Sequence, residues 1–324
     1  MATFVRTQTI DHPIGASGRL DLEVTSADVQ VRAIEGAEAH VRGTFEIRAA
    51  SDEEADRVFE AVQLQVERSG GSLSVSERRD RSGLASALGR LFGGDQADLS
   101  VAVELPAGAE LRLATVSGDI QAEGLSGEQR YNTVSGDLYL TELGGSVRVK
   151  AVSGDATLRA DGPFELRAEA VSGDLSVAAP LLRALRATTV SGDIDIEGEL
   201  SSGGEFRAET VSGDLSVGLL GSATFHVRGV STDVSSDIDH RLEGRLDRRR
   251  VIIGSGGPDF QFSSMSGDLM IRRARRVERG SFDEAPPVSR PSARDQLSVL
   301  EALERGEIDV DEAARRLAGG APDA

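Results

Sequence analysis

The sequence predicts a mainly β fold, a parallel β-solenoid with coils of about 19 residues. Three observations predict it. The triplet Ser-Gly-Asp recurs, and from Ser117 to Ser212 successive serines stand 18, 18, 19, 19 and 21 residues apart. Apolar and polar residues alternate on both sides of each triplet, which is typical of half-buried strands. Aromatic residues make up only 4% of the chain, so we expect an aliphatic core. The usual crossover rule predicts a right-handed coil.

Each coil is expected to hold two strands with Val-Ser-Gly-Asp as the corner between them. After the corner, apolar residues stand three and five positions beyond the serine, as in Ile120 and Ala122 or Ile194 and Ile196. Before the corner they stand six and four positions earlier, as in Leu111 and Leu113. Further copies of the corner are Ser26-Ala27-Asp28, the degenerate Ser231-Thr232-Asp233 and Ser266-Gly267-Asp268. The step from Ser231 to Ser266 is 35 residues, which predicts two coils in succession.

The triplets are interpreted as structural corners. Glycine permits a positive φ, and serine and aspartate side chains can bond backbone groups where a strand bends. The corner residues are Ser117, Gly118, Asp119, Ser135, Gly136, Asp137, Ser153, Gly154, Asp155, Ser172, Gly173, Asp174, Ser191, Gly192, Asp193, Ser212, Gly213 and Asp214. The alternative is a column of aspartates that holds Ca²⁺ through oxygen ligands, and the sequence leaves it open. No other metal site and no cofactor are expected.

The solenoid is expected over residues 1–279, with an irregular insertion at about 48–100. Within that insertion, residues 51–60 predict a short helix with a capping box, residues 62–75 predict a hairpin, and LASALGRLF at 84–92 is an amphipathic fragment. Residues 280–292 are a linker rich in proline and serine. Residues 293–319 predict a helical hairpin that is too small to be stable alone, so it either docks on the solenoid or binds a protein partner. Its candidate partner-binding residues are Leu297, Leu300, Leu303 and Leu317.

The repeats resemble a known family. The recurring TVSGD strand repeat, with VAVELPAGAELRLATVSGDI at 101–120, resembles the bacterial Toastrack family, adhesin-like β-strand-repeat domains of unknown function. The resemblance covers roughly residues 3–275. The tail VLEALERGEIDVDEAARRL at 299–317 is similar to the small helical domains called SHOCT-like. The resemblance implies a solenoid scaffold without catalysis, and relatives occur in phage-shock and Lia-type envelope stress systems. This chain differs from many relatives because we find no transmembrane helix and its hairpin is C-terminal.

An arginine stands five residues before most corner serines, and the alternation places it on the outer face. These candidate anion-binding residues are Arg112, Arg130, Arg148, Arg167, Arg186 and Arg207. Such a ladder of like charges needs compensation, either from carboxylates such as Glu169 and Glu209 or from an anionic lipid surface or envelope polymer. A second basic cluster, interpreted as protection of an edge strand, contains Arg272, Arg273, Arg275, Arg276 and Arg279.

Composition narrows the function classes. A net charge of −18 argues against nucleic-acid binding, and the chain contains no cysteine. The N-terminus does not resemble a signal peptide, so we expect a cytoplasmic protein, peripheral to the membrane if the arginines bind lipid. The four histidines show no metal-ligand spacing and no nucleophile partner, so we expect no enzyme. The leading interpretation is a non-catalytic scaffold or binding protein linked to envelope stress. The alternatives are a solenoid that self-associates end to end, and a polysaccharide-active β-helix enzyme.

Overall fold

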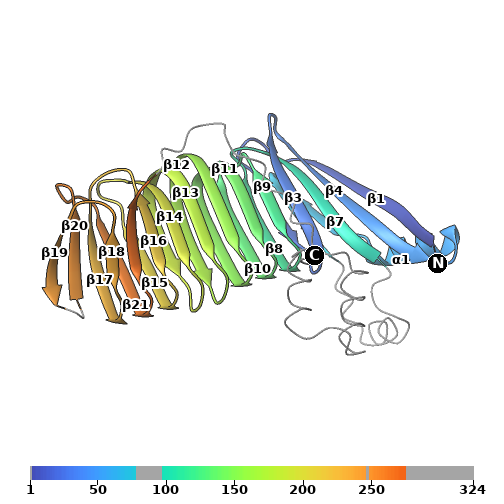
Figure 1. Cartoon of the computed structure of the whole chain (residues 1–324). Helices are drawn as coiled ribbons and strands as arrows, with labels where there is room; N and C mark the ends of the chain where they lie inside the picture. Colours follow the sequence, from blue (N-terminus) through green and yellow to red (C-terminus); the bar gives the residue numbers. More distant parts are fainter. Residues whose placement is uncertain (1, 78–96, 246–247, 275–324) are drawn as a thin grey trace, which may run out of the picture. The chain divides into compact units, whose positions relative to one another are not determined.

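The computed structural model describes residues 2–77, 97–245 and 248–274, which Figure 1 shows in colour. The chain divides into two units, Met1–Val277 and Glu278–Ala324, and the described residues all lie in the first. The expected linker at 280–292, the hairpin at 293–319 with its leucines, and the amphipathic fragment at 84–92 lie outside the described residues. So do Arg275, Arg276 and Arg279.

The described residues are mainly β, as the sequence predicts. The strands of the first half are β1 (Ala2–Pro13), β2 (Arg19–Glu23), β3 (Ala27–Ile34), β4 (Glu38–Ala49), β5 (Gln65–Ser69), β6 (Ser72–Ser76), β7 (Ala97–Pro106), β8 (Glu110–Ser117), β9 (Ile120–Glu123), β10 (Glu128–Ser135) and β11 (Leu138–Ser153). Those of the second half are β12 (Ala156–Ala170), β13 (Leu175–Thr188), β14 (Ile194–Leu200), β15 (Phe206–Ser212), β16 (Leu215–Leu219), β17 (Ala223–Ser231), β18 (Val234–Ser236), β19 (His240–Arg245), β20 (Arg248–Ile253), β21 (Asp259–Ser266) and β22 (Leu269–Arg273). The described residues contain one helix, α1 (Asp52–Val62).

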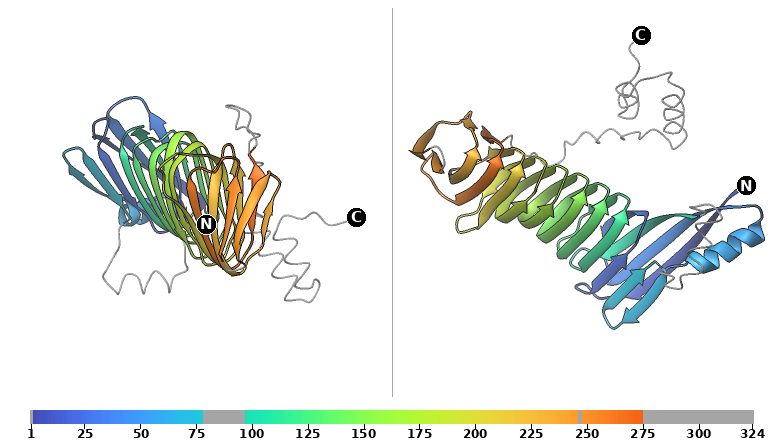
Figure 2. Two further views of the ribbon diagram at one scale, coloured as in Figure 1. Left: turned by 90° about the vertical axis from the view of Figure 1, so that its left-hand side faces the viewer. Right: turned by 90° about the horizontal axis from the view of Figure 1, so that it is seen from below.

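The strands stack in two layers joined at the corners (Figure 2). The first layer contains the strand segments that precede each corner, and in it β8, β10, β11, β12, β13 and β15 pair in parallel. The second layer contains the segments that follow each corner, such as β9, β14 and β16. Equivalent repeat residues pair directly, for example Arg112 with Arg130 and Arg130 with Arg148. Each repeat position therefore forms a column that runs across the strands. We call one such level of the stack a rung.

The core lies between the two layers and is filled mostly by aliphatic side chains. The alternation predicted from the sequence is confirmed: Leu111, Leu113, Ile120 and Ala122 are all at most 2% exposed. One rung differs, because Gln129 and Tyr131 occupy positions where the other rungs carry apolar residues, and both are fully buried. The Tyr131 hydroxyl donates to Gln129 Oε1 at 2.9 Å, and Gln129 Nε2 donates to the backbone oxygens of Leu125 and Gly144. Burial also raises the pKa of the Tyr131 phenol.

Parallel pairing does not reach the ends of the stack, which corrects the expectation of a parallel solenoid throughout. At the N-terminal end β4 pairs antiparallel with both β1 and β7, and β5 pairs antiparallel with β6. At the other end β20 pairs antiparallel with β17 and β19. Of these pairs only β5–β6 and β19–β20 are consecutive strands, and a short connection can only reverse the chain direction. The strands of the other pairs are separated in the sequence by further elements.

The segment expected to be an irregular insertion is regular in its described part. Ser51 caps α1 by accepting a hydrogen bond from the Glu54 amide at 3.2 Å, and Glu54 accepts from the Ala50 amide at 2.8 Å. The predicted helix is therefore present with its capping box. Helix α1 packs on β1, β4 and β7 at one end of the stack (Figure 1). The predicted hairpin is β5 and β6.

The last coils are not stacked in chain order. Ser266 pairs with Ser212 on one side and with Ser231 on the other, so β21 and β22 lie between the rung of Ser212 and the rung of Ser231. The prediction of two successive coils from Ser231 to Ser266 is wrong. β19 and β20 form an antiparallel pair at the edge instead, and the chain then returns to fill the rung that was left open. β7 is likewise inserted between β3 and β4.

Candidate interaction surfaces

The glycines of the triplets occupy backbone conformations that other residues rarely adopt. From Gly118 to Gly213 the six corner glycines have φ between 110° and 148°. At Gly154, with φ of 116°, a Cβ atom would stand 2.2 Å from the backbone oxygen of Gly136 on the preceding rung. Glycine is therefore needed both for the local conformation and for the close approach of successive rungs.

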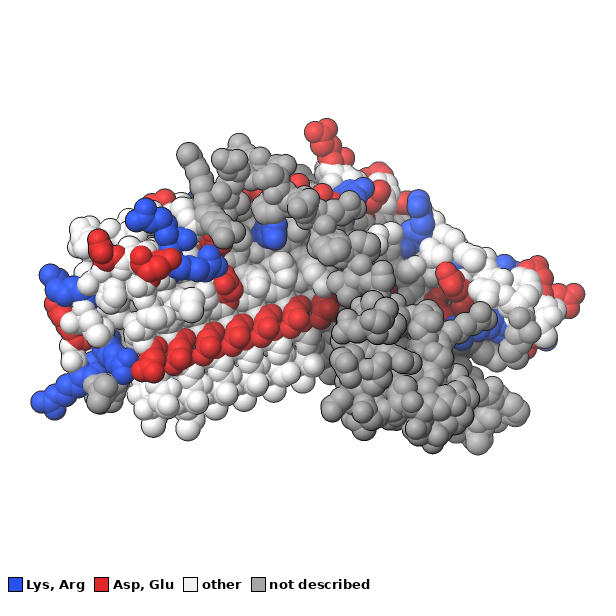
Figure 3. Space-filling model, in the orientation of Figure 1, with Lys and Arg blue, Asp and Glu red and all other residues white. Residues whose placement is uncertain are grey.

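The aspartates of the triplets form a hydrogen-bonded ladder. Each aspartate amide after that of Asp28, where the ladder begins, donates to Oδ1 of the aspartate on the neighbouring rung. Asp155 donates to Asp137 at 3.0 Å, and Asp174 donates to Asp155 at 2.8 Å. Eight such bonds join the column Asp28, Asp119, Asp137, Asp155, Asp174, Asp193, Asp214, Asp268 and Asp233. Figure 3 shows this aspartate column as a continuous acidic line flanked by uncharged residues. Amide donors offset part of the repulsion between neighbouring carboxylates.

The described residues contain no group of three or more histidine, cysteine, aspartate or glutamate side chains placed to hold a metal ion. One oxygen of each aspartate from Asp28 to Asp268 in the ladder accepts a backbone amide. The serines contribute differently from the expectation. In three rungs a buried threonine two residues before the serine donates to the serine carbonyl, as Thr115 does to Ser117 at 2.9 Å. The only corner-serine hydroxyl bond recorded in the described residues joins Ser117 to Ser26 at 3.2 Å.

The valine before each serine forms an exposed apolar column. Its six valines are between 44% and 49% exposed, while the neighbouring alternate positions of the same strands are buried. We call it the valine column: Val116, Val134, Val152, Val171, Val190 and Val211. Met265 continues it at 62% exposure and Val230 ends it at 88%. Sequence reasoning treated these residues as part of the corner and did not recognise the column, although the signal was a β-branched apolar residue at an outward position in every repeat.

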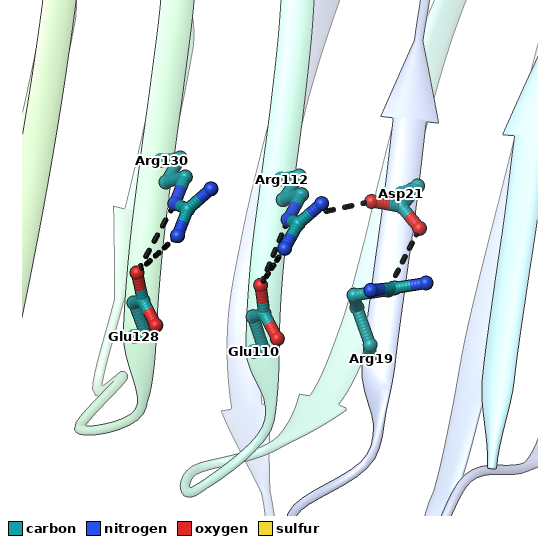
Figure 4. A network of polar contacts seen from close by, with 6 residues as sticks. All are labelled: Arg19, Asp21, Glu110, Arg112, Glu128 and Arg130. Atoms are coloured by element: carbon teal, nitrogen blue, oxygen red, sulfur yellow. Dashed lines mark hydrogen bonds and ion pairs between the residues drawn. The ribbon is translucent and has the colours of Figure 1, made fainter.

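The arginine column is mostly neutralised by glutamates on the same strand. Arg112 contacts Glu110 at 2.7 Å and Arg130 contacts Glu128 at 2.6 Å, as Figure 4 shows. Figure 4 also shows Asp21, which lies 3.0 Å from Arg19 and 3.8 Å from Arg112.

Further along the column, Arg167 binds Glu169 at 2.8 Å, and Arg207 binds Glu209. The Arg130 hydrogen bond lowers the pKa of Glu128. The pKa of Glu169 is lowered mainly by its hydrogen bond with Arg167 and also by its hydrogen bond with Lys150.

Two members of the column lack such a partner. Arg148 and Arg186 make no recorded ion pair with a described residue. Arg148 also adds to the field that lowers the pKa of Glu128. The structure therefore places four of the six predicted anion-binding arginines in intramolecular ion pairs.

Arg272 does not protect an edge strand, contrary to the interpretation of the second basic cluster. Its strand β22 lies between β16 and β18, and its side chain crosses Gly218 to reach Asp195 at 2.8 Å and Glu197 at 3.5 Å. Gly218 leaves room for this path, since a Cβ there would be 3.0 Å from the Arg272 guanidinium. Arg272 links three strands of the second layer.

A groove of about 330 Å³ lies on the outer face of the first layer near β20. It is lined mainly by charged and polar side chains, of which one is acidic, and we call it the arginine groove: Arg207, His226, Arg228, Arg248, Arg249, Arg250, Asp259, Gln261 and Ser263. Sequence reasoning continued the arginine column only to Arg207 and missed this cluster. The run Arg248-Arg249-Arg250 was the available signal, but its strand was not predicted.

The geometry of the repeats can be compared with known proteins. Residues 95–183 match the Toastrack DUF4097 family model. The match supports the Toastrack resemblance for this stretch, which runs from just before β7 into β13. No curated protein matches the chain. The SHOCT-like resemblance of residues 299–317 gains no support, and those residues lie outside the described ranges.

Solved structures of low sequence identity also align. A "putative cell adhesion protein" of Clostridium sporogenes aligns with TM-score 0.30 and 11% identity, over 84% of this chain and 100% of that one. A "putative adhesin" of Bacteroides fragilis aligns with TM-score 0.35 and 12% identity, over 82% of this chain and 97% of that one. A "putative lipid binding protein" of Parabacteroides distasonis aligns with TM-score 0.25 and 13% identity, over 83% of this chain and 97% of that one. TM-scores this low carry no argument about this chain.

Proposed function

We propose that this chain is a non-catalytic binding protein whose stacked layers hold the valine column against a protein partner. The column carries the proposal because the fold does not require it. Threonine has the same branched shape and would suit the strand equally well, yet every repeat from Val116 to Val211 exposes valine. Contiguous exposed apolar surface marks interaction sites more often than isolated apolar residues do.

The free energy gained by burying the valine column is sufficient for a specific contact. Burying one valine fully is worth about 1.5 kcal/mol, so covering six half-exposed valines contributes roughly 4 kcal/mol before the costs of association. The aspartate column runs alongside, three residues further on in each repeat, as Val171 and Asp174 illustrate. The partner chemistry that fits is an apolar row flanked by lysine or arginine. A second copy of this chain carries the same acidic column and a net charge of −18, so pairing through this surface is disfavoured.

We further propose that the partner belongs to a bacterial envelope stress response. The support is the Toastrack match of residues 95–183 together with the occurrence of such repeats in envelope stress systems. In the described residues no helix has the length and hydropathy needed to cross a membrane. The edge strands β1 and β19 carry charged residues, which disfavours the alternative of end-to-end assembly.

The test is site-specific photo-crosslinking in the producing bacterium, with and without a membrane-perturbing agent. A photo-reactive residue at Val171 should give one discrete adduct with a basic protein, and stress should change its yield. The matched control is the same residue at exposed Ser176, which follows the same corner but lies in the second layer. Changing Val152, Val171 and Val190 to threonine, with the photo-reactive residue moved to Val134, should abolish the adduct while leaving the melting temperature nearly unchanged. Equal adducts at Val171 and Ser176, or none at either, would overturn the binding role; a discrete adduct that stress does not change would overturn only the envelope stress assignment.

A further inference from the structure

The arginine groove concentrates positive charge in a chain of net charge −18. Its arginines come from neighbouring strands of the first layer: Arg207 from β15, Arg228 from β17, and Arg248 and Arg250 from β20. β21 contributes the neutral hydrogen-bonding side chains of Gln261 and Ser263 between them. The groove is thus built by strands with fixed registers and not by a loop.

The registers place like charges directly opposite each other. Arg228 pairs with Arg248 across β17 and β20, and Arg248 pairs with Arg245 across β20 and β19. Directly opposed residues on antiparallel strands have Cβ atoms about 5 Å apart, and like charges at that separation destabilise the sheet. Three arginines in one row therefore carry a cost unless an anion compensates them.

The carboxylates in the described part of this region pair with other basic residues, among them the groove residues Arg207, His226 and Arg250. Glu209 binds Arg207, and Asp259 Oδ1 lies 2.7 Å from His226 Nε2. Glu243 lies 3.0 Å from Arg241 and 3.9 Å from Arg250. No ion pair with a described residue is recorded for Arg228, Arg245 or Arg248.

Edge protection does not explain the row. It accounts for Arg245, because β19 pairs only with β20 and lies at the edge of the layer. Arg228 is on β17, which is paired on both sides by β20 and β21, and Arg248 is on β20, which is paired by β17 and β19. These two strands present no free edge in the layer that a charge would need to protect.

We propose that the arginine groove binds a soluble ligand that carries several phosphate groups in a row. Guanidinium groups donate paired hydrogen bonds to phosphate oxygens, and neutral donors such as Gln261 and Ser263 can complete the contacts. Arg245 does not line the groove but stands opposite Arg248 on the adjoining strand β19. Because strands are about 4.8 Å apart, the row from Arg228 through Arg248 to Arg245 spans about 10 Å, which suits a chain of phosphates better than a single one. This site is separate from the valine column and goes beyond the proposed function.

Calorimetric titration of the full chain with tripolyphosphate and with inorganic phosphate tests the proposal. Tripolyphosphate should bind more tightly than inorganic phosphate, and added salt should weaken it. The double change Arg228→Gln and Arg248→Gln should weaken tripolyphosphate binding on the order of 100-fold, since each lost charge-assisted contact contributes about tenfold or more. The matched control is Arg148→Gln with Arg186→Gln, which removes the same charge from the same layer outside the groove and should have little effect.

A second readout separates binding from folding. Without ligand, Arg248→Gln should melt no lower than the parent, because it removes repulsion from Arg228 and Arg245. With tripolyphosphate the parent and the control variant should gain more melting temperature than Arg248→Gln. An equal loss of tripolyphosphate affinity in the groove variant and in the control variant would overturn the assignment of binding to the groove. Absence of tripolyphosphate binding would overturn the proposal, and so would binding to vesicles of anionic lipid in its place, which would identify a membrane surface.

Discussion

Replacing Gly154 with alanine tests the corner geometry. The new Cβ would stand 2.2 Å from the Gly136 oxygen and 3.3 Å from Asp137 Oδ1, and φ of 116° is unfavourable for any L side chain. Backbone strain of this kind costs about 1–3 kcal/mol. Displacing the rungs also weakens the bond from the Asp155 amide to Asp137, worth about 1.5–3 kcal/mol because the acceptor is charged. The expected loss is about 3–5 kcal/mol, or roughly 10 °C in melting temperature followed by circular dichroism.

The chain offers a matched control at Gly162. A Cβ at Gly162 meets no atom within 4 Å, and its φ is not in the range that disfavours side chains. Gly162→Ala reduces the freedom of the unfolded chain in the same way as Gly154→Ala, and it should be neutral or stabilise by up to about 1 kcal/mol. If both variants melt at the same temperature, the corner glycines are not constrained as described.

Two further predictions concern polar pairs. Glu169 has a pKa lowered by Arg167 and Lys150, so the ion pair stabilises the fold above the ordinary glutamate pKa of 4.5 and this contribution is lost as the pH falls through the lowered value. Arg167→Gln should therefore cost up to about 1 kcal/mol near neutral pH and nothing in strong acid, as measured by urea unfolding; a pH-independent difference would contradict this reasoning. Tyr131→Phe should cost about 1–3 kcal/mol by leaving Gln129 Oε1 buried without its donor, and combining it with Gln129→Met should cost less than the sum of the two single changes.

The sequence predicts the middle of the fold well because the repeat is strict there. From Leu111 to Val217 each coil repeats the same alternation, so burial and pairing follow from one template. The ends could not be predicted in the same way. Whether β20 continues the parallel stack or reverses depends on the length of the connection and on which edge is still open, and neither is written in the local pattern. The rung with Gln129 and Tyr131 also departs from the template, since its polar atoms are satisfied only by each other and by carbonyls across the turn.

The surfaces were predicted less completely than the core. The arginine column was recognised, but its compensation depends on side-chain paths: Arg130 turns to Glu128 two residues before it, and Arg167 turns to Glu169 two residues after it. The arginine groove depends on the pairing of β17 with β20, which brings Arg228 beside Arg248 although they are 20 residues apart. Such a juxtaposition requires the register, and the sequence alone does not supply the register of an irregular end.

Strands β21 and β22 lie between strands that are synthesised before them, and this order affects folding during translation. A repeat protein can ordinarily fold as it is synthesised, because each new coil adds to the coil before it. Here β17 leaves the ribosome before β21, and the strand that finally lies between β15 and β17 is not yet translated. Until residue 271 has emerged, β15, β16, β17 and β18 all present unpaired edges. A translational pause before Asp259 would therefore prolong the exposure of these edges, and that interval is when the nascent chain is most open to aggregation or to capture by a chaperone.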